Sequence, residues 1–176
     1  YQYYQIMKKA NNKLNAAIII IGNEILSGRT QDVNVAVISN WLNGLGVKLQ
    51  EVRVIPDIEN TIIDTINNVR KKFKYVFTTG GIGPTHDDIT SKSTAKAFKL
   101  KYCYHPEAYR ILKSYYEKGK FNIGRRKMAK MPKNASLILN PSSAAPGFFV
   151  KNVFCLPGVP SILKSMLGGL SNKIIG

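Results

Sequence analysis

Residues Tyr75 to Thr90 read YVFTTGGIGPTHDDIT. The segment begins with apolar and β-branched residues typical of a buried strand, continues into a glycine-rich loop, and leads into an amphipathic segment. Strand, glycine loop and helix start form a layout that binds phosphate. Glycine lets the backbone approach a ligand, and the free N–H groups at a helix N-terminus favour an anion. We therefore expect Gly80, Gly81 and Gly83 to present backbone N–H groups to a phosphate.

Two adjacent carboxylates, Asp87 and Asp88, stand at the end of this loop. An acidic pair does not suit a bare phosphate. It suits a phosphate that carries a divalent cation, or a reaction that needs a carboxylate. The alternative is that one of the two aspartates only caps the next helix. Their position behind three glycines at a strand end favours the functional interpretation.

Length and composition limit the class of protein. The chain has 176 residues, of which 44% are hydrophobic, which suits one domain with a sizeable core. No run approaches the roughly 18 apolar residues of a membrane helix, and the N-terminus lacks a secretory h-region. We exclude Tyr1 to Ile6, which precede the first Met, from the fold. We expect a tail over residues 1–13 and one domain over residues 14–176.

The two cysteines, Cys103 and Cys155, are too few for a disulfide framework. Cys155 lies in an apolar run, so we expect a buried free thiol. A reducing, cytoplasmic environment fits this pattern.

The net charge of +16 raises the question of a nucleic-acid partner. Of the 26 basic residues only six are Arg, the residue that most often reads bases. Eight basic residues face a single acid, Glu117, between Lys113 and Lys133. We interpret this segment as a surface that attracts anions, and we expect an anionic small molecule rather than nucleic acid or a membrane.

Strand and helix patterns alternate along the chain. We expect strands at 16–21, 48–55, 75–79 and 136–139, and a β-hairpin at 148–156. We expect helices from residue 34 to the glycines at 44 and 46, and at 62–73, 90–98, 106–119 and 161–167. The basic stretch 121–133 has no clear period. Such alternation predicts an α/β fold, with a parallel sheet covered on both faces.

Open parallel sheets bind ligands beyond the carboxyl ends of their strands. Three loops follow expected strands, namely Gly22 to Gly28, Pro56 to Asp57, and Gly80 to Asp88. We expect the sheet to bring their carboxylates within reach of one another: Glu24, Asp57, Asp87 and Asp88. The loop spacing matches neither a P-loop nor a dinucleotide fingerprint, and no zinc spacing exists. Any metal would be a hard cation such as Mg²⁺.

Six segments resemble, in order, the molybdopterin-binding MoaB/Mog-type family, and most closely its CinA-like branch. They are GNEILSGRTQDVN (22–34), VIPD (54–57), TTGGIGPTHDDIT (78–90), RKMAKMP (126–132), APGF (145–148) and LPGVP (156–160). The resemblance implies a three-layer α/β/α domain with a mostly parallel sheet and a small β-hairpin. It also implies self-association as a dimer or trimer. Relatives usually extend past the helix that follows LPGVP, so we expect a C-terminal truncation.

The resemblance also implies two chemistries. In molybdenum-cofactor enzymes of this fold, the glycine loop binds pterin phosphate and two aspartates support Mg²⁺-dependent adenylyl transfer. By motif position these match Asp57 and Asp88. The CinA-like branch is associated with metal-dependent cleavage of the pyrophosphate in ADP-ribose, and the motif with Glu24 and Asp32 is typical of that branch. His86 stands where the family commonly has Pro or another residue, so we assign it no inherited role.

We therefore predict a metal-dependent pyrophosphate hydrolase acting on a nucleotide-sugar such as ADP-ribose. The alternatives are a molybdopterin adenylyltransferase or pterin-binding protein, and a non-enzymatic anion-binding or nucleic-acid-binding module. Asp57 and Asp88 are the expected catalytic residues, and Asp88, Asp87 and Glu24 the expected ligands of the cation. The expected phosphate- and nucleotide-binding residues are Gly22, Glu24, Gly80, Gly81, Gly83, Thr90, Pro157 and Gly158. Lys92 or Arg126 could add a positive contact.

Overall fold

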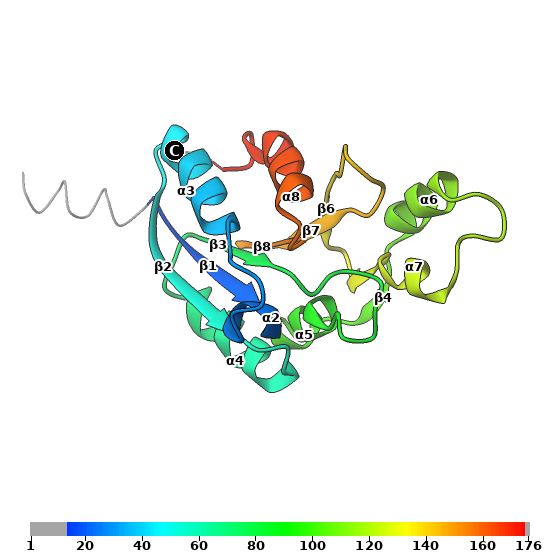
Figure 1. Cartoon of the computed structure of the whole chain (residues 1–176), viewed down its shortest axis with the longest axis horizontal. Coiled ribbons are helices and arrows are strands. Elements are labelled where there is room, and N and C mark those ends of the chain that lie inside the picture. Colours follow the sequence, from blue (N-terminus) through cyan, green and yellow to red (C-terminus); the bar gives the residue numbers. More distant parts are fainter. Residues whose placement is uncertain (1–13, 175–176) are drawn as a thin grey trace, which may run out of the picture.

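The computed structural model describes residues 14–174, and its centre is a six-stranded sheet in the order β2-β1-β3-β8-β7-β6 (Figure 1). The strands are β1 (Asn15–Ile21), β2 (Lys48–Ile55), β3 (Tyr75–Thr79), β6 (Ser136–Ile138), β7 (Gly147–Val150) and β8 (Val153–Leu156). The first four strands in that order run parallel, β7 pairs antiparallel with β8, and β6 pairs antiparallel with β7. The tail expected over residues 1–13 lies outside the described residues.

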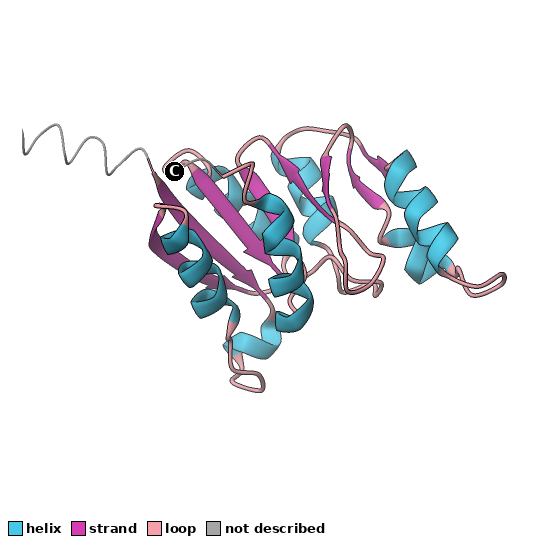
Figure 2. Ribbon diagram, turned by 90° about the horizontal axis from the view of Figure 1, so that it is seen from above, coloured by secondary structure: helices cyan, strands magenta, loops and turns pink. Residues whose placement is uncertain are grey.

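Helices cover both faces of the sheet, which makes three layers (Figure 2). They are α2 (Asn23–Leu26), α3 (Asn34–Gly44), α4 (Glu59–Val69), α5 (Thr90–Ala97), α6 (Pro106–Tyr115), α7 (Ile123–Lys127) and α8 (Pro160–Leu167), with a 3₁₀ turn at Gly168–Leu170. Within residues 14–174, no helix is both long and apolar enough to cross a membrane.

Two hydrophobic cores lie on the two faces of the sheet. One packs Ile19 of β1 with Ile62 of α4 and continues into α5 and α6. The other packs Ile18 of β1 with Ile38 of α3 and Leu163 of α8. Adjacent residues of β1 thus enter opposite cores, so the whole strand is buried. This explains why its sequence is apolar throughout instead of alternating.

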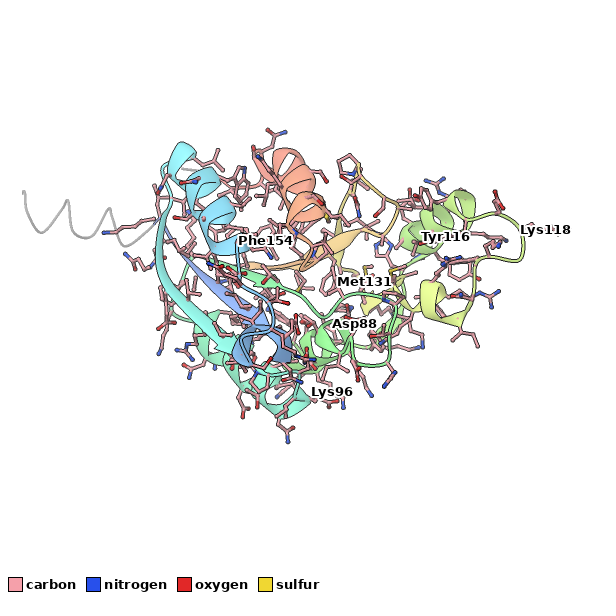
Figure 3. The ribbon with its side chains drawn as sticks, viewed as in Figure 1. Asp88, Lys96, Tyr116, Lys118, Met131 and Phe154 are labelled. Carbon is pink, nitrogen blue, oxygen red and sulfur yellow. The ribbon has the colours of Figure 1, made fainter. Side chains whose placement is uncertain are left out.

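A second lobe lies beside the sheet and consists of α6, α7 and a two-stranded antiparallel sheet (Figure 1). Its strands are β4 (Tyr102–Tyr104) and β5 (Lys130–Pro132). Met131 of β5 is buried in the core, whereas Lys118 lies at the outer end of the lobe (Figure 3). The lobe therefore carries most of the basic segment away from the sheet.

The structure confirms the predicted α/β class, the parallel core and the hairpin, which joins the main sheet through β8. The helix predicted at 106–119 is too long, because it ends at Tyr115 and Tyr116 has extended backbone. The helix predicted at 62–73 begins at Glu59 and ends at Val69; Phe73 packs on the core from the following turn. The predictions missed α2, β4, β5 and α7.

Cys155 provides a test of the core, because it is fully buried on β8. Burial raises the pKa of its thiol to about 11, so the reactive thiolate is disfavoured in the folded state at neutral pH. A reagent that forms mixed disulfides with exposed thiols should therefore modify the half-buried Cys103 in native protein at pH 8, and Cys155 only in denaturant. A Cys103→Ser variant is the control. Rapid labelling of that variant in its native state would contradict the burial of Cys155.

Candidate functional site

The glycine loop leaves β3 through a backbone conformation that favours glycine. Gly80 and Gly81 have φ values of 92° and 76°. A Cβ at Gly81 would overlap the hydroxyl of Thr90. That hydroxyl donates a hydrogen bond to the carbonyl of Gly80 (3.0 Å), and the Thr90 N–H donates to the carbonyl of Gly81 (2.9 Å). Thr90 thus fixes the loop against the start of α5.

Asp88 is held at the far end of this loop by its neighbours. Its Oδ2 accepts hydrogen bonds from the N–H of Thr85 (2.9 Å) and from the Thr85 hydroxyl (2.8 Å). Lys127 of α7 donates from Nζ to the carbonyl oxygens of Thr85 and of Asp88, the latter at 2.7 Å. Burial lowers the pKa of Lys127, while Asp88 and Asp87 act in the opposite direction. The second lobe therefore braces the loop through one lysine.

The loops after β1 and β2 are joined to each other. The N–H of Asn23 donates to Oδ2 of Asp57 (3.2 Å), and the N–H of Asp57 donates to Oδ1 of Asn23 (3.4 Å). The N–H of Gly22 donates to the carbonyl of Ile55 (3.1 Å). These bonds place α2 and its Glu24 directly beside Asp57, because α2 follows Gly22 without a connecting loop.

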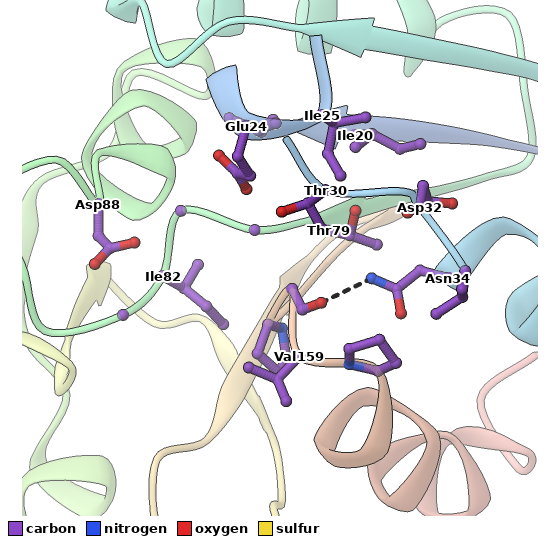
Figure 4. A pocket seen from close by; sticks show the side chains of 18 of the residues that line it. Ile20, Glu24, Ile25, Thr30, Asp32, Asn34, Thr79, Ile82, Asp88 and Val159 are labelled. Carbon is purple, nitrogen blue, oxygen red and sulfur yellow. Dashed lines mark hydrogen bonds between the residues drawn. The ribbon is translucent and has the colours of Figure 1, made fainter. Parts of the chain in front are cut away.

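The loop between β8 and α8, which contains Gly158, closes the site on its fourth side. Asn34, the first residue of α3, is buried, and its Nδ2 donates to the carbonyl of Gly158 at 2.9 Å (Figure 4). A Cβ at Gly158 would lie 3.5 Å from Cα of Gly80. The close approach of these two glycine-containing loops sets the width of the space between them.

These segments enclose a cavity of about 520 Å³, which we call the main cavity (Figure 4). Its wall is partly apolar, with Ile20, Ile25, Ile82 and Val159. Its polar side chains include Glu24, Thr30, Asp32, Thr79 and Asp88. Gly80, Gly81, Gly83, Pro157 and Gly158, five of the predicted binding residues, also line it. The volume lies within the range of about 300–1,000 Å³ that is usual for small-molecule sites.

Beside the main cavity is a smaller depression of about 390 Å³, which we call the acidic hollow. It is lined by all four carboxylates that the sequence predicts to meet: Glu24, Asp57, Asp87 and Asp88. Burial raises the pKa of Asp57 most, an effect that the Asn23 N–H opposes and the other three carboxylates reinforce. The predicted gathering of acidic side chains is confirmed; Arg29 and His86 line the same hollow, and Nε2 of His86 lies 3.3 Å from Oδ1 of Asp87.

A cation would need ligands from outside the protein as well. In the described part of the chain, no three His, Cys, Asp or Glu side chains are grouped closely enough to hold a metal ion. Mg²⁺ is commonly bound by one or two carboxylates together with water and substrate phosphates. The hard oxygen donors of the acidic hollow fit that mode, and two of its carboxylates, Glu24 and Asp88, also line the main cavity.

The other predicted site residues lie at different places. Thr90 is fully buried and bonds to the loop backbone instead of lining the cavity, and Gly22 is also buried. Lys92 is exposed on α5 and does not line the main cavity. Arg126 packs its guanidinium over Phe121 in the second lobe. We therefore regard Thr90 and Gly22 as supports of the site.

Sequence reasoning missed two residues that organise the site. Asn34 belongs to the GNEILSGRTQDVN motif, but its bond to Gly158 spans 124 positions of sequence. Lys127 stands in a basic stretch in which no single lysine is distinct, and it reaches Asp88 across 39 positions. A local pattern cannot identify either contact, because each depends on how the chain folds back.

A cavity at the carboxyl ends of parallel strands, in a three-layer α/β/α domain, defines an α/β protein with a ligand-binding site at the sheet edge. Residues 17–175 match the family described as "Probable molybdopterin binding domain". The crystal structure of the protein CinA from Thermoplasma acidophilum is 34% identical, with a TM-score of 0.87 over 93% of this chain and 99% of that one. The chain therefore belongs to the molybdopterin-binding domain family, in its CinA-like branch.

A further relative supports the family, and a more distant structure shares the fold. The CinA-like protein of Geotalea uraniireducens is 38% identical over 160 residues, which are 88% of this chain and 38% of that protein. The tungsten cofactor synthesizing protein MoaB from Pyrococcus furiosus is 20% identical, with a TM-score of 0.58 over 92% of each chain, and shares the fold. The chain spans 59 to 63% of the length of the first curated relatives it matches.

Removal of the Lys127 brace should loosen the glycine loop. In Lys127→Met the carbonyls of Thr85 and Asp88 lose a charged hydrogen-bond donor. The lost free energy should shift the equilibrium between the closed and the open loop about tenfold toward the open form. Hydrogen exchange of the Thr85 and Asp88 amides should accelerate accordingly, and Lys127→Arg should restore much of the protection. Lys113→Met, at an exposed position of α6, is the matched control. Unchanged exchange in Lys127→Met would show that the brace is dispensable.

Asp57 should lower stability at neutral pH. Because its pKa is raised in the folded state, its contribution to stability is present below the unfolded pKa and is lost as pH rises through the folded pKa. Asp57→Asn should therefore raise the Tm at pH 7, and the difference should shrink toward pH 3. Asp64→Asn, an exposed change of equal charge on α4, controls for net charge. A lower Tm for Asp57→Asn than for this control would contradict the account.

Proposed function

We propose that this domain is a metal-dependent hydrolase that cleaves the pyrophosphate of a nucleotide-sugar such as ADP-ribose. The observation on which the proposal rests is that the main cavity and the acidic hollow adjoin each other. The two share four lining residues, Ile21, Glu24, Gly81 and Asp88. A diphosphate that lies along the glycine loop would therefore have a site for a nucleoside or sugar on one side and a cluster of carboxylates on the other.

The glycine loop would bind the diphosphate. Gly81 and Gly83 line the main cavity and have no side chain to keep phosphate oxygens from the backbone. A Cβ at Gly83 would lie 2.8 Å from Oδ2 of Asp88, so glycine there also leaves room for that carboxylate. The apolar wall of the main cavity, with Ile82 and Val159, would exclude water from one side of the ligand.

The carboxylates would have different roles. Asp88, fixed by Thr85 and by Lys127, would hold the divalent cation with help from Glu24 and Asp87. When bound, such a cation neutralises charge on the diphosphate and makes a water molecule more acidic. Asp57 would orient the attacking water and accept its proton, because its raised pKa makes it a better base than an ordinary aspartate.

The similarity to CinA-like proteins is the reason for preferring hydrolysis to adenylyl transfer. The structural match to CinA has a TM-score of 0.87, and the match to MoaB has 0.58. The ligand in either chemistry is an anionic small molecule. Self-association as a dimer or trimer, and a cytoplasmic location, stay predictions from the sequence.

Incubation with ADP-ribose and a divalent cation, followed by chromatography of the products, tests the proposal. The parent chain should form AMP and ribose 5-phosphate. Asp88→Asn should reduce the rate by about a hundredfold or more, since acid–base and metal-dependent steps contribute on that scale. Asp64→Asn, exposed on α4, should keep the parental rate.

Absence of AMP from folded protein with Mg²⁺, Mn²⁺ and Co²⁺ would overturn the proposal. Equal rates for Asp88→Asn and the parent would overturn the assignment of the metal site. Transfer of an adenylyl group from ATP to a pterin phosphate by the same protein would establish the alternative chemistry in its place.

A further inference from the structure

A third depression of about 480 Å³ lies on the other side of the glycine loop, and we call it the tyrosine–lysine hollow. It shares only Pro84 and Asp88 with the main cavity. Its walls come from both lobes: the glycine loop, α5, β4, α7 and β5. Its ionisable and aromatic side chains are His86, Asp88, Lys92, Tyr102, Tyr104, Lys127 and Lys130. Neither the family motifs nor the proposed hydrolysis assigns it a role.

The pairing of β4 with β5 places the aromatic rings next to a cation. Tyr102 and Tyr104 are two positions apart on β4, so their side chains share one face of the strand. Lys130 is the partner of Tyr104 in the antiparallel ladder. Its Nζ lies 5.0 Å from the Tyr104 ring centre and 5.6 Å from that of Tyr102. The Lys130 ammonium thus lies over both ring faces, and aromatic surface and positive charge stand within one side-chain length of each other.

The charge of the hollow is positive and largely uncompensated. Lys92 and Lys130 form no ion pair within residues 14–174, and Lys127 donates to backbone carbonyls. The one carboxylate in the wall, Asp88, accepts two hydrogen bonds from Thr85. Burial raises the pKa of Tyr102 to about 12, so its hydroxyl stays protonated and can donate a hydrogen bond. The lysines and the Tyr102 hydroxyl favour an anionic ligand, and they outnumber the one carboxylate, Asp88, that opposes it.

We propose that the tyrosine–lysine hollow binds a planar aromatic anion, namely the base and phosphate of a nucleotide. The base would replace the Lys130 ammonium over the rings of Tyr104 and Tyr102, and the long Lys130 side chain would turn toward the phosphate, which would also lie near Lys92. Stacking on an aromatic side chain is tolerant of base identity, while lysine recognises phosphate as a point charge. The volume of the hollow is sufficient for one nucleotide.

The position of Asp88 extends this inference to the substrate. Asp88 lines the main cavity, the acidic hollow and the tyrosine–lysine hollow. A ligand with its diphosphate on the glycine loop could therefore place its nucleoside in the tyrosine–lysine hollow and its sugar in the main cavity. This assignment of the two halves rests on the proposed function, whereas the affinity of the hollow for a nucleotide does not.

Isothermal titration calorimetry of the whole chain measures the affinity of the site for a nucleotide and needs no enzymatic turnover. The probes are AMP and ribose 5-phosphate, which has the phosphate and no base. The variants are Tyr104→Leu, Tyr104→Phe, which keeps the ring, and Lys130→Met. Lys113→Gln, at an exposed position of α6, is the control for charge. Circular dichroism of each variant verifies its fold.

The variants should separate the two parts of the nucleotide. Tyr104→Leu should weaken AMP about tenfold, because one stacking contact is lost, and leave ribose 5-phosphate unchanged. Tyr104→Phe should bind AMP as the parent does. Lys130→Met should weaken both probes about tenfold, since both carry the phosphate. Lys113→Gln should change neither.

Three outcomes would overturn the inference. The first is absence of AMP binding to the parent chain. The second is parental AMP affinity in Tyr104→Leu and in Lys130→Met, which would place AMP in the main cavity. The third is an oligoadenylate that binds more than about tenfold tighter than AMP, since the hollow would then belong to a strand-binding surface. If ADP-ribose is not hydrolysed but AMP binds to the parent and the variants as expected, the proposed function is rejected and the nucleotide site is retained.

Discussion

The hydrogen bonds from Thr90 to the carbonyls of Gly80 and Gly81 are the contacts on which the site depends. They turn the chain from the end of β3 into α5 within a space that has no room for a side chain at Gly81. Because β3 lies in the middle of the sheet, between β1 and β8, this turn lies where the other loops converge. The main cavity exists because the backbone at the glycines is held in that turn.

The site gathers acidic side chains although the whole protein is strongly basic. A chain of net charge +16 gathers four of its ten acidic residues around one hollow. Lysines stand close behind them, with Lys127 bonded to the carbonyl of Asp88 and Lys92 nearby. Such a juxtaposition suits a ligand that is itself anionic and that brings a cation with it, since both signs of charge then find a partner.

The sequence predicted the parallel sheet and most of its helices, since strands buried on both faces are apolar throughout and amphipathic helices repeat every three to four residues. It also predicted that Glu24, Asp57 and Asp88 would meet, because carboxyl ends of parallel strands share one edge. It missed the three-residue strands β4 and β5, which are too short to show a period. Long-range hydrogen bonds, such as that from Lys127 to the carbonyl of Asp88, could not be predicted either, because they depend on the tertiary fold.

The most direct test of the central claim is a crystal structure of the chain with Mg²⁺ and the α,β-methylene analogue of ADP-ribose, which cannot be cleaved at the bridging position. The two phosphoryl groups should lie along Gly81 and Gly83, the cation should contact a carboxylate of the acidic hollow, and Asp57 should face the methylene bridge. A diphosphate bound elsewhere, for example against the basic segment from Lys113 to Lys133, would contradict it.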